Sequence, residues 1–78
     1  MIDEAIERRL AYYVQEKGLT NLTLKVSPIL GAYLTRGLFT SILGRWKKKY
    51  RCKIELVEIT DFTVLQNEFY NEKGDKLD

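Results

Sequence analysis

The sequence predicts one α+β domain in which helices pack on one face of a three-stranded mixed sheet, in the order α-β-α-α-β-β. Three observations predict this class. Seventy-eight residues suffice for a single core, because a chain this short buries about 60–65% of its unfolded surface. A composition with 45% apolar residues, 12% aromatic residues and one proline is typical of a folded chain. Apolar side chains recur at helical spacing in some segments and with a period of two in others.

The first predicted element is a helix over residues 2–17, which Gly18 ends as a C-terminal cap. One helical stripe is apolar and consists of Ile2, Ile6, Leu10, Tyr13 and Val14. The first strand follows at residues 22–26, where leucine and valine alternate with Thr23 and Lys25. This period of two predicts a half-buried strand.

Two short helices are predicted next. Ser27 and Pro28 begin the first, because serine accepts bonds from free backbone N–H groups and proline at the first helical position loses only an unpartnered N–H. Gly37 interrupts this helix. The second helix contains Gly44, at a cost of about 1 kcal/mol relative to alanine. Its apolar stripe consists of Ile42, Leu43, Trp46 and Tyr50.

Two further strands are predicted at residues 54–59 and 62–70. The alternation of the first slips once, which indicates either a bulge or a fully buried end. Thr60 and Asp61 turn the chain, so these strands are expected to form a hairpin. Residues 71–75 form a turn that leads either to a short fourth strand or to a frayed end. The helical pair is expected to cross over in the right-handed sense.

The side chains exclude several kinds of chemistry. Cys52 is the single cysteine and the chain has no histidine, so neither an internal disulfide nor a zinc site is expected. The acidic residues are scattered as on ordinary surface, and no general base of the usual kind is present. We therefore expect no catalytic residue, metal or cofactor. No apolar run is long enough to span a membrane and the N-terminus is acidic, which favours a cytoplasmic protein without a membrane partner.

Basic residues are concentrated in one segment. Residues 45–53 hold six basic groups and no acidic group, whereas the other 69 residues carry seven basic and eleven acidic groups. This concentration predicts weak electrostatic contact with RNA phosphates. The alternative is a solvated helix end, where the helix dipole favours each cation by about 0.3–1 kcal/mol. The candidate RNA-binding residues are Arg36, Arg45, Lys47, Lys48, Lys49, Arg51 and Lys53.

Aromatic and apolar residues near this segment have two interpretations each. Trp46 and Tyr50 either stack on bases or continue the core stripe, and their spacing favours the core. Leu38 and Phe39, the candidate interaction residues, either anchor the inter-helix turn in the core or contact another subunit. Cys52 is expected to be an unreactive strand residue rather than a thiol of lowered pKa. Packing is likewise expected for Tyr12, Tyr13 and Tyr33 rather than a surface for a partner protein.

The order β-α-α-β-β, with Gly37 between two short helices and a basic stretch before the second strand, resembles a KH RNA-binding domain. In that family, two glycines separated by two residues let the backbone approach RNA phosphates. The corresponding run here is Gly37-Leu38-Phe39-Thr40, which lacks the second glycine. KH-type gripping of RNA is therefore not expected, and topology alone is an analogy.

Ordered motifs extend over nearly the whole chain. They are the helix beginning IDEAIE, the strand LTLKV, the segment SPILGAYLTRG, the basic RWKKKY and the final LQNEFYNEKGDKLD. Together they resemble the C-terminal small domain of the RNase E/G endoribonucleases, particularly RNase G-like enzymes of Bacteroidetes-type bacteria. The third is similar to that family's His-Pro-x-x-x-Ala-Tyr-x-x-x-Gly pattern, with Ser27 in place of histidine before Pro28.

This resemblance implies that residues 1–78 are one domain of a larger ribonuclease, whose catalytic acidic residues and zinc-linking cysteines lie upstream. It implies a non-catalytic role in RNA processing, through contact with RNA, with the parent chain and within a homo-oligomer. Two alternatives remain open. One is a free-standing KH-like RNA-binding protein, and the other is a purely structural protein-interaction module.

Overall fold

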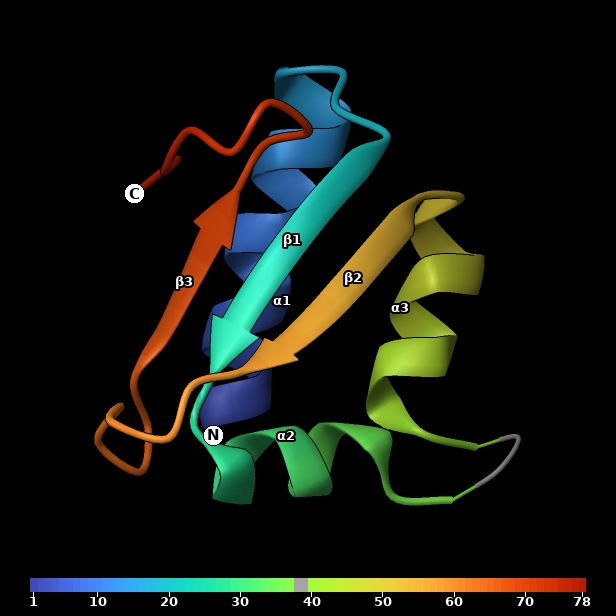
Figure 1. Cartoon of the computed structure of the whole chain (residues 1–78). Coiled ribbons are helices and arrows are strands. Elements are labelled where there is room, and N and C mark those ends of the chain that lie inside the picture. The colour runs from blue at the N-terminus through green and yellow to red at the C-terminus, as the bar shows by residue number, and fades with distance from the viewer. Residues whose placement is uncertain (38–39) are drawn as a thin grey trace.

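A three-stranded mixed sheet forms one layer of the fold, with the first helix behind it in the view of Figure 1. The computed structural model describes residues 1–37 and 40–78. The central strand β1 (Asn21–Val26) pairs in parallel with β2 (Lys53–Glu58) and antiparallel with β3 (Asn67–Tyr70). The helices are α1 (Ile2–Ala11), its π-helical continuation η1 (Tyr12–Glu16), α2 (Pro28–Thr35) and α3 (Ile42–Tyr50). The predicted α+β class and element order are confirmed.

The first helix ends where the sequence predicts, but its last turn is wider than expected. In η1 the Lys17 N–H donates to the Tyr12 carbonyl oxygen, 3.2 Å away, which is a five-residue step. Gly18 then leaves the helix at φ 71°, a left-handed conformation that glycine adopts without steric cost. The helix thereby turns into the short connection to β1.

Side chains from the helices and from one face of the sheet form a single apolar core. On β1, Leu22, Leu24 and Val26 are buried, while the residues between them are only half-buried. This alternation is the predicted half-buried strand. The core also contains Tyr13 and Trp46, as expected, and its other members are Ile6, Leu10, Leu30, Leu34, Leu43, Cys52, Ile54 and Phe69.

Both short helices begin at serine caps. The Ser27 hydroxyl oxygen accepts from the Leu30 N–H at 3.1 Å, and the Ser41 hydroxyl oxygen accepts from the Gly44 N–H at 3.0 Å. Ser27 is 2% exposed and also donates to the carbonyl oxygen of Val64 in the β2–β3 connection. The first cap therefore has a second function, because it fixes a loop that is distant in sequence.

The predicted hairpin between the last two strands is wrong. β3 pairs with β1, so β2 and β3 form opposite edges of the sheet. The third strand is also shorter than predicted, because residues 62–66 form turns, such as that closed by the Gln66 N–H and the Thr63 carbonyl oxygen at 3.0 Å. The chain between β2 and β3 passes the end of β1, so that β3 lies along the other side of β1. Phe69 is then opposite Leu24, and both side chains are fully buried. This burial stabilises the observed pairing.

The predicted irregularity in the second strand is also absent. Residues 53–58 pair one to one with residues 21–26 without a bulge, and the end of the strand is half-buried or exposed. The slip in the pattern arises because Leu56 and Val57 are both half-buried, on opposite faces. After β3, the predicted turn leads to an isolated bridge between Tyr70 and Lys76 rather than to a fourth strand.

Candidate nucleic-acid interface

Basic side chains cover the exposed side of α3 and the turn that joins it to β2. Leu43 and Trp46 are buried in the core and fix the orientation of the helix. Apart from Gly44, the exposed positions that remain carry cationic groups. The basic surface consists of six exposed residues, Arg45, Lys47, Lys48, Lys49, Arg51 and Lys53.

The end of α3 concentrates these charges. Residues 47–49 occupy its last turn, where the helix dipole favours cations. Arg51 ends the helix in the left-handed conformation at φ 52°, and the Cys52 N–H donates to the Lys47 carbonyl oxygen at 3.2 Å. A tight turn joins the end of α3 to the start of β2 at Lys53 (Figure 1), so only this turn separates the last two basic residues from the end of α3.

One lysine of the basic surface is paired with an acidic residue. The Lys49 ammonium lies 2.9 Å from a carboxylate oxygen of Glu7, which also accepts a hydrogen bond from the Tyr50 hydroxyl at 2.7 Å. The bond from Lys49, followed by that from Tyr50, holds the pKa of Glu7 below its usual value. Within residues 1–37 and 40–78, the other five cationic groups have no acidic partner within 4.0 Å.

Arg36 lies apart from the other predicted RNA-binding residues. It caps the C-terminal end of α2 and is exposed. That end of α2 lies beyond the N-terminal end of α3, whereas Lys47 and the residues after it lie at the opposite end of α3 (Figure 1). The structure therefore does not bring Arg36 together with the C-terminal part of the basic surface. The predicted interaction residues Leu38 and Phe39 lie outside the described residues.

The aromatic residues of α3 belong to the core rather than to the surface. Trp46 is 4% exposed, and Tyr50 packs against the core with its hydroxyl bonded to Glu7. They are therefore not placed to stack on bases. Tyr12 departs from the packing that we expected, since it is 49% exposed on η1, where the Lys17 ammonium lies 5.6 Å from its ring centre.

Cys52 has the unreactive environment that the sequence favours. Its side chain is buried beneath the basic surface, and this burial raises the pKa of the thiol, against a smaller opposing effect of Lys47. The alternative of a thiol with a lowered pKa is therefore wrong. In the described part of the chain, no group of three or more potential ligands is arranged to hold a metal ion.

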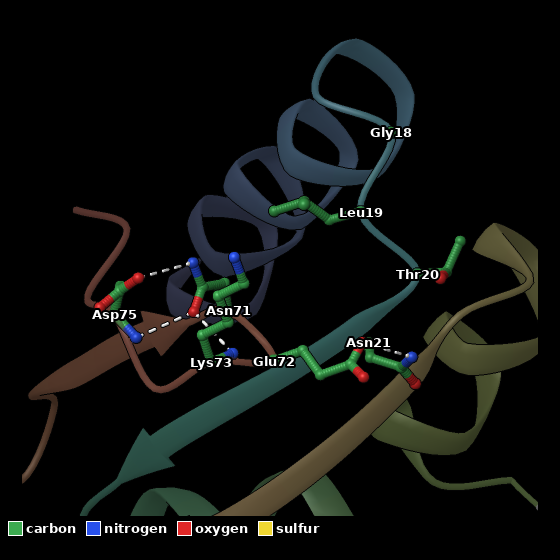
Figure 2. A pocket seen from close by; sticks show the side chains of 8 residues that line it. All are labelled: Gly18, Leu19, Thr20, Asn21, Asn71, Glu72, Lys73 and Asp75. Atoms are coloured by element: carbon green, nitrogen blue, oxygen red, sulfur yellow. Dashed lines mark hydrogen bonds between the residues drawn. The ribbon is translucent and has the colours of Figure 1, made fainter.

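A polar hollow of about 380 Å³ lies between the start of β1 and the turn that follows β3 (Figure 2). The Asn71 side-chain oxygen accepts from the N–H groups of Lys73 and Asp75, each at 2.9 Å, and fixes this turn. Glu72 extends toward β1 and accepts from the Asn21 amide at 3.1 Å. With two carboxylates and one lysine in its lining, the hollow is less suited to phosphate than the basic surface.

Sequence reasoning missed two features. Glu7 is separated from Lys49 by 42 residues, and no local pattern indicates that they meet. An apolar hollow of about 330 Å³ also escaped notice, because its three contributing segments are distant in sequence. It is lined by Met1, Ile2, Ile29, Leu30, Tyr33, Val64 and Leu65.

Comparison of the chain with protein-family models, with curated proteins and with solved structures gave no match. The fold and the site therefore carry the functional interpretation. Among the described helices, none combines the length and the apolar character needed to cross a membrane.

Proposed function

We propose that this chain is a non-catalytic RNA-contacting domain, of the kind that forms the C-terminal small domain of RNase E/G-like endoribonucleases. One observation supports RNA contact above the others. Five exposed cationic groups of the basic surface lack an acidic partner among the described residues. A cluster of this kind attracts a polyanion, because each neutralised phosphate releases a counterion.

The predicted recognition is electrostatic and independent of sequence. The aromatic side chains of α3 are packed inside or bonded, so base stacking contributes little. Lys and Arg contacts to phosphates position a protein without reading bases. The domain therefore adds affinity for RNA in general, and the choice of cleavage site belongs to other parts of the proposed parent enzyme.

RNA binding is tested by titrating the chain with single-stranded RNA at several salt concentrations. Five phosphate contacts predict a slope of log K against log salt of about −3.5. The triple substitution Lys47→Glu, Lys48→Glu and Arg51→Glu removes three contacts and reduces the slope by about 2.

The matched control reverses the same number of charges elsewhere, at the exposed residues Arg8, Lys17 and Lys73. It changes the net charge equally, so it separates a local surface from a general attraction. Equal loss of affinity in both triple variants would contradict the proposed interface. Cleavage of RNA by the purified chain would contradict the non-catalytic role. The parent-enzyme proposal predicts a reading frame that continues upstream of Met1 into a catalytic region.

The apolar hollow supports a second role, in assembly. Four large apolar side chains around it are exposed, namely Met1 (83%), Ile29 (65%), Leu65 (57%) and Val64 (53%). None of the side chains that line the hollow carries a charge. Two copies can therefore meet there without like-charge repulsion, and such apolar patches mark interaction sites.

Sedimentation over a range of protein concentrations tests this role. The chain is expected to self-associate, and Val64→Asp with Leu65→Asp is expected to leave it monomeric, because both charges would be buried in the contact. Tyr12→Asp is the control, since Tyr12 is similarly exposed on a different surface. Monomeric behaviour of the unmodified chain at every concentration would refute self-association through this hollow.

A further inference from the structure

The two edge strands of the sheet, β3 and β2, differ in whether other residues hydrogen-bond to their outer sides. The edge at β3 is closed by residues that follow it in the chain. Tyr70 forms a bridge with Lys76, and the Leu77 N–H donates to the Phe69 carbonyl oxygen at 2.9 Å. The Asn71 N–H donates to the Asp75 carbonyl oxygen at the same distance. These C-terminal residues lie beside β3 and do not extend to the other edge of the sheet, at β2 (Figure 1).

The outward backbone groups of β2 are identified by its pairing with β1. The N–H groups of Lys53 and Ile59 donate to Thr20 and Val26, each at 2.8 Å, so odd-numbered residues of this strand face β1. Because backbone groups alternate between the two sides of a strand, those of Ile54, Leu56 and Glu58 point away from β1. Within residues 1–37 and 40–78, no hydrogen bond involves these outward N–H and carbonyl groups.

A row of outward donors and acceptors at strand spacing is complementary to another extended backbone. We propose that the outer edge of β2 binds an extended segment of a partner protein, which adds as an antiparallel strand. For an antiparallel strand, the charges of β2 determine the charges of the partner, since Lys53 begins β2 and Glu58 ends it, and both are exposed. The partner segment therefore has a basic N-terminal end and an acidic C-terminal end. Its apolar side chains lie beside Ile54 and Leu56, which belong to or pack against the core.

A second copy of the chain is a poorer occupant of this edge. Antiparallel pairing of two β2 strands centred on Leu56 places Ile54 opposite Glu58. Pairing centred on Glu55 places two Glu55 carboxylates directly opposite, which is destabilising. In these two registers the exposed residues of β2 disfavour self-pairing, while a segment of complementary charge avoids both mismatches. This edge is distinct from the apolar hollow and from most of the basic surface, so the proposal does not depend on either role.

Amide hydrogen exchange of the free chain, followed by NMR, tests whether the edge is open. The N–H groups of Leu56 and Glu58 are expected to exchange fast, and those of Glu55 and Val57 slowly, in an alternating pattern; the N–H of Ile54, a buried residue, is not used for this comparison. Slow exchange of all four would overturn the proposal. If that protection increased with protein concentration, the occupant would be a second copy instead.

The partner chemistry is tested with an end-blocked peptide, Lys-Thr-Val-Thr-Val-Glu, by NMR titration. Saturable shifts of the Ile54, Leu56 and Glu58 amides are expected in the millimolar range that suits a short strand. The peptide Glu-Thr-Val-Thr-Val-Lys is expected to bind several-fold more weakly. Absence of saturable shifts, or equal binding of both peptides, would overturn the proposal.

Proline at position 56 gives the sharpest control. Leu56→Pro removes an N–H that points outward and retains every ladder bond to β1, as proline on an edge strand permits. Leu56→Ala removes more of the side chain than proline does but retains the N–H. Binding is expected to survive in the alanine variant and to be lost in the proline variant. Slow exchange of the Glu55 and Val57 amides verifies that each variant is folded, and binding by a folded proline variant would refute backbone pairing.

Discussion

Glu7 shows how one residue connects the fold with the basic surface. Its carboxylate accepts from the Lys49 ammonium at 2.9 Å and from the Tyr50 hydroxyl at 2.7 Å. These bonds join α1 to the last turn of α3, and they hold the pKa of Glu7 below its usual value of 4.5. The same pair removes one cation from those available to phosphate. Glu7 therefore stabilises the helix that presents the basic surface and limits its charge.

The depressed pKa predicts how the contribution of Glu7 depends on pH. A carboxyl group whose pKa is lower in the folded state stabilises the fold above its unfolded pKa, and this stabilisation is lost as pH falls through the folded value. We expect Glu7→Gln to lower the free energy of unfolding at pH 7. Below the usual carboxyl pKa of 4.5, the difference from the unmodified chain is expected to shrink as pH falls.

Denaturant unfolding at neutral and acidic pH measures this difference. Glu16→Gln serves as the control, because Glu16 is exposed and makes no ion pair within the described residues. If the effect of Glu7→Gln were the same at both pH values, the carboxylate charge would not be the stabilising factor.

At the scale of single elements, two serine caps with the same local geometry are predicted to differ in energy. Ser27→Ala is expected to cost more than Ser41→Ala, although each cap bond alone contributes about 0.5–2 kcal/mol. Ser27 is 2% exposed and its hydroxyl also donates to the Val64 carbonyl oxygen. Its loss leaves the buried Leu30 N–H and the part-buried Val64 carbonyl oxygen without the serine hydroxyl, whereas the Ser41 bond is exposed to water. Thermal or denaturant unfolding measures both variants, and equal costs would show that the loop contact contributes nothing.

The elements also show what the sequence predicts and what it does not. Ser27, Pro28 and Gly18 marked helix boundaries because caps and left-handed residues act within a few positions. The alternation in β1 predicted its buried face for the same local reason. The partner of β3 is decided by the burial of Phe69 against Leu24, which are 45 positions apart in the printed sequence, and no local pattern encodes that contact.

The candidate site likewise has features that the sequence predicts and features that it does not. The basic surface was predictable because its residues are contiguous and the helical stripe of Leu43 and Trp46 sends them outward. Its pairing with Glu7, the separation of Arg36 and the apolar hollow depend on how distant segments meet, so only the structure gives them. The RNA itself stays a prediction, since a cluster of cations identifies a polyanion and not its sequence.

At the scale of the whole molecule, the last residue connects the two ends of the chain. The Asp78 carboxylate accepts hydrogen bonds from the Arg9 guanidinium and the Tyr13 hydroxyl. The Phe69 N–H donates to it at 3.4 Å. Burial, followed by the bond to Asp78, raises the pKa of the Tyr13 phenol above its usual value of 10.0. One side chain thus ties the C-terminal tail, which closes the β3 edge, to the first helix.

Asp78→Ala is therefore expected to lower the free energy of unfolding by about 1–2 kcal/mol, because it leaves Arg9 and Tyr13 without their carboxylate. The pKa of Tyr13 is expected to fall only part of the way toward 10.0, since burial is the larger cause of its shift. Asp75→Ala is the matched control, because its exposed carboxylate makes one long contact, 3.4 Å from the Asn71 amide nitrogen. Denaturant unfolding and ultraviolet titration of the phenol measure both effects. If both the stability and the Tyr13 titration of Asp78→Ala equalled those of the unmodified chain, the tail would not be held by this residue, and the β3 edge would depend on its backbone bonds alone.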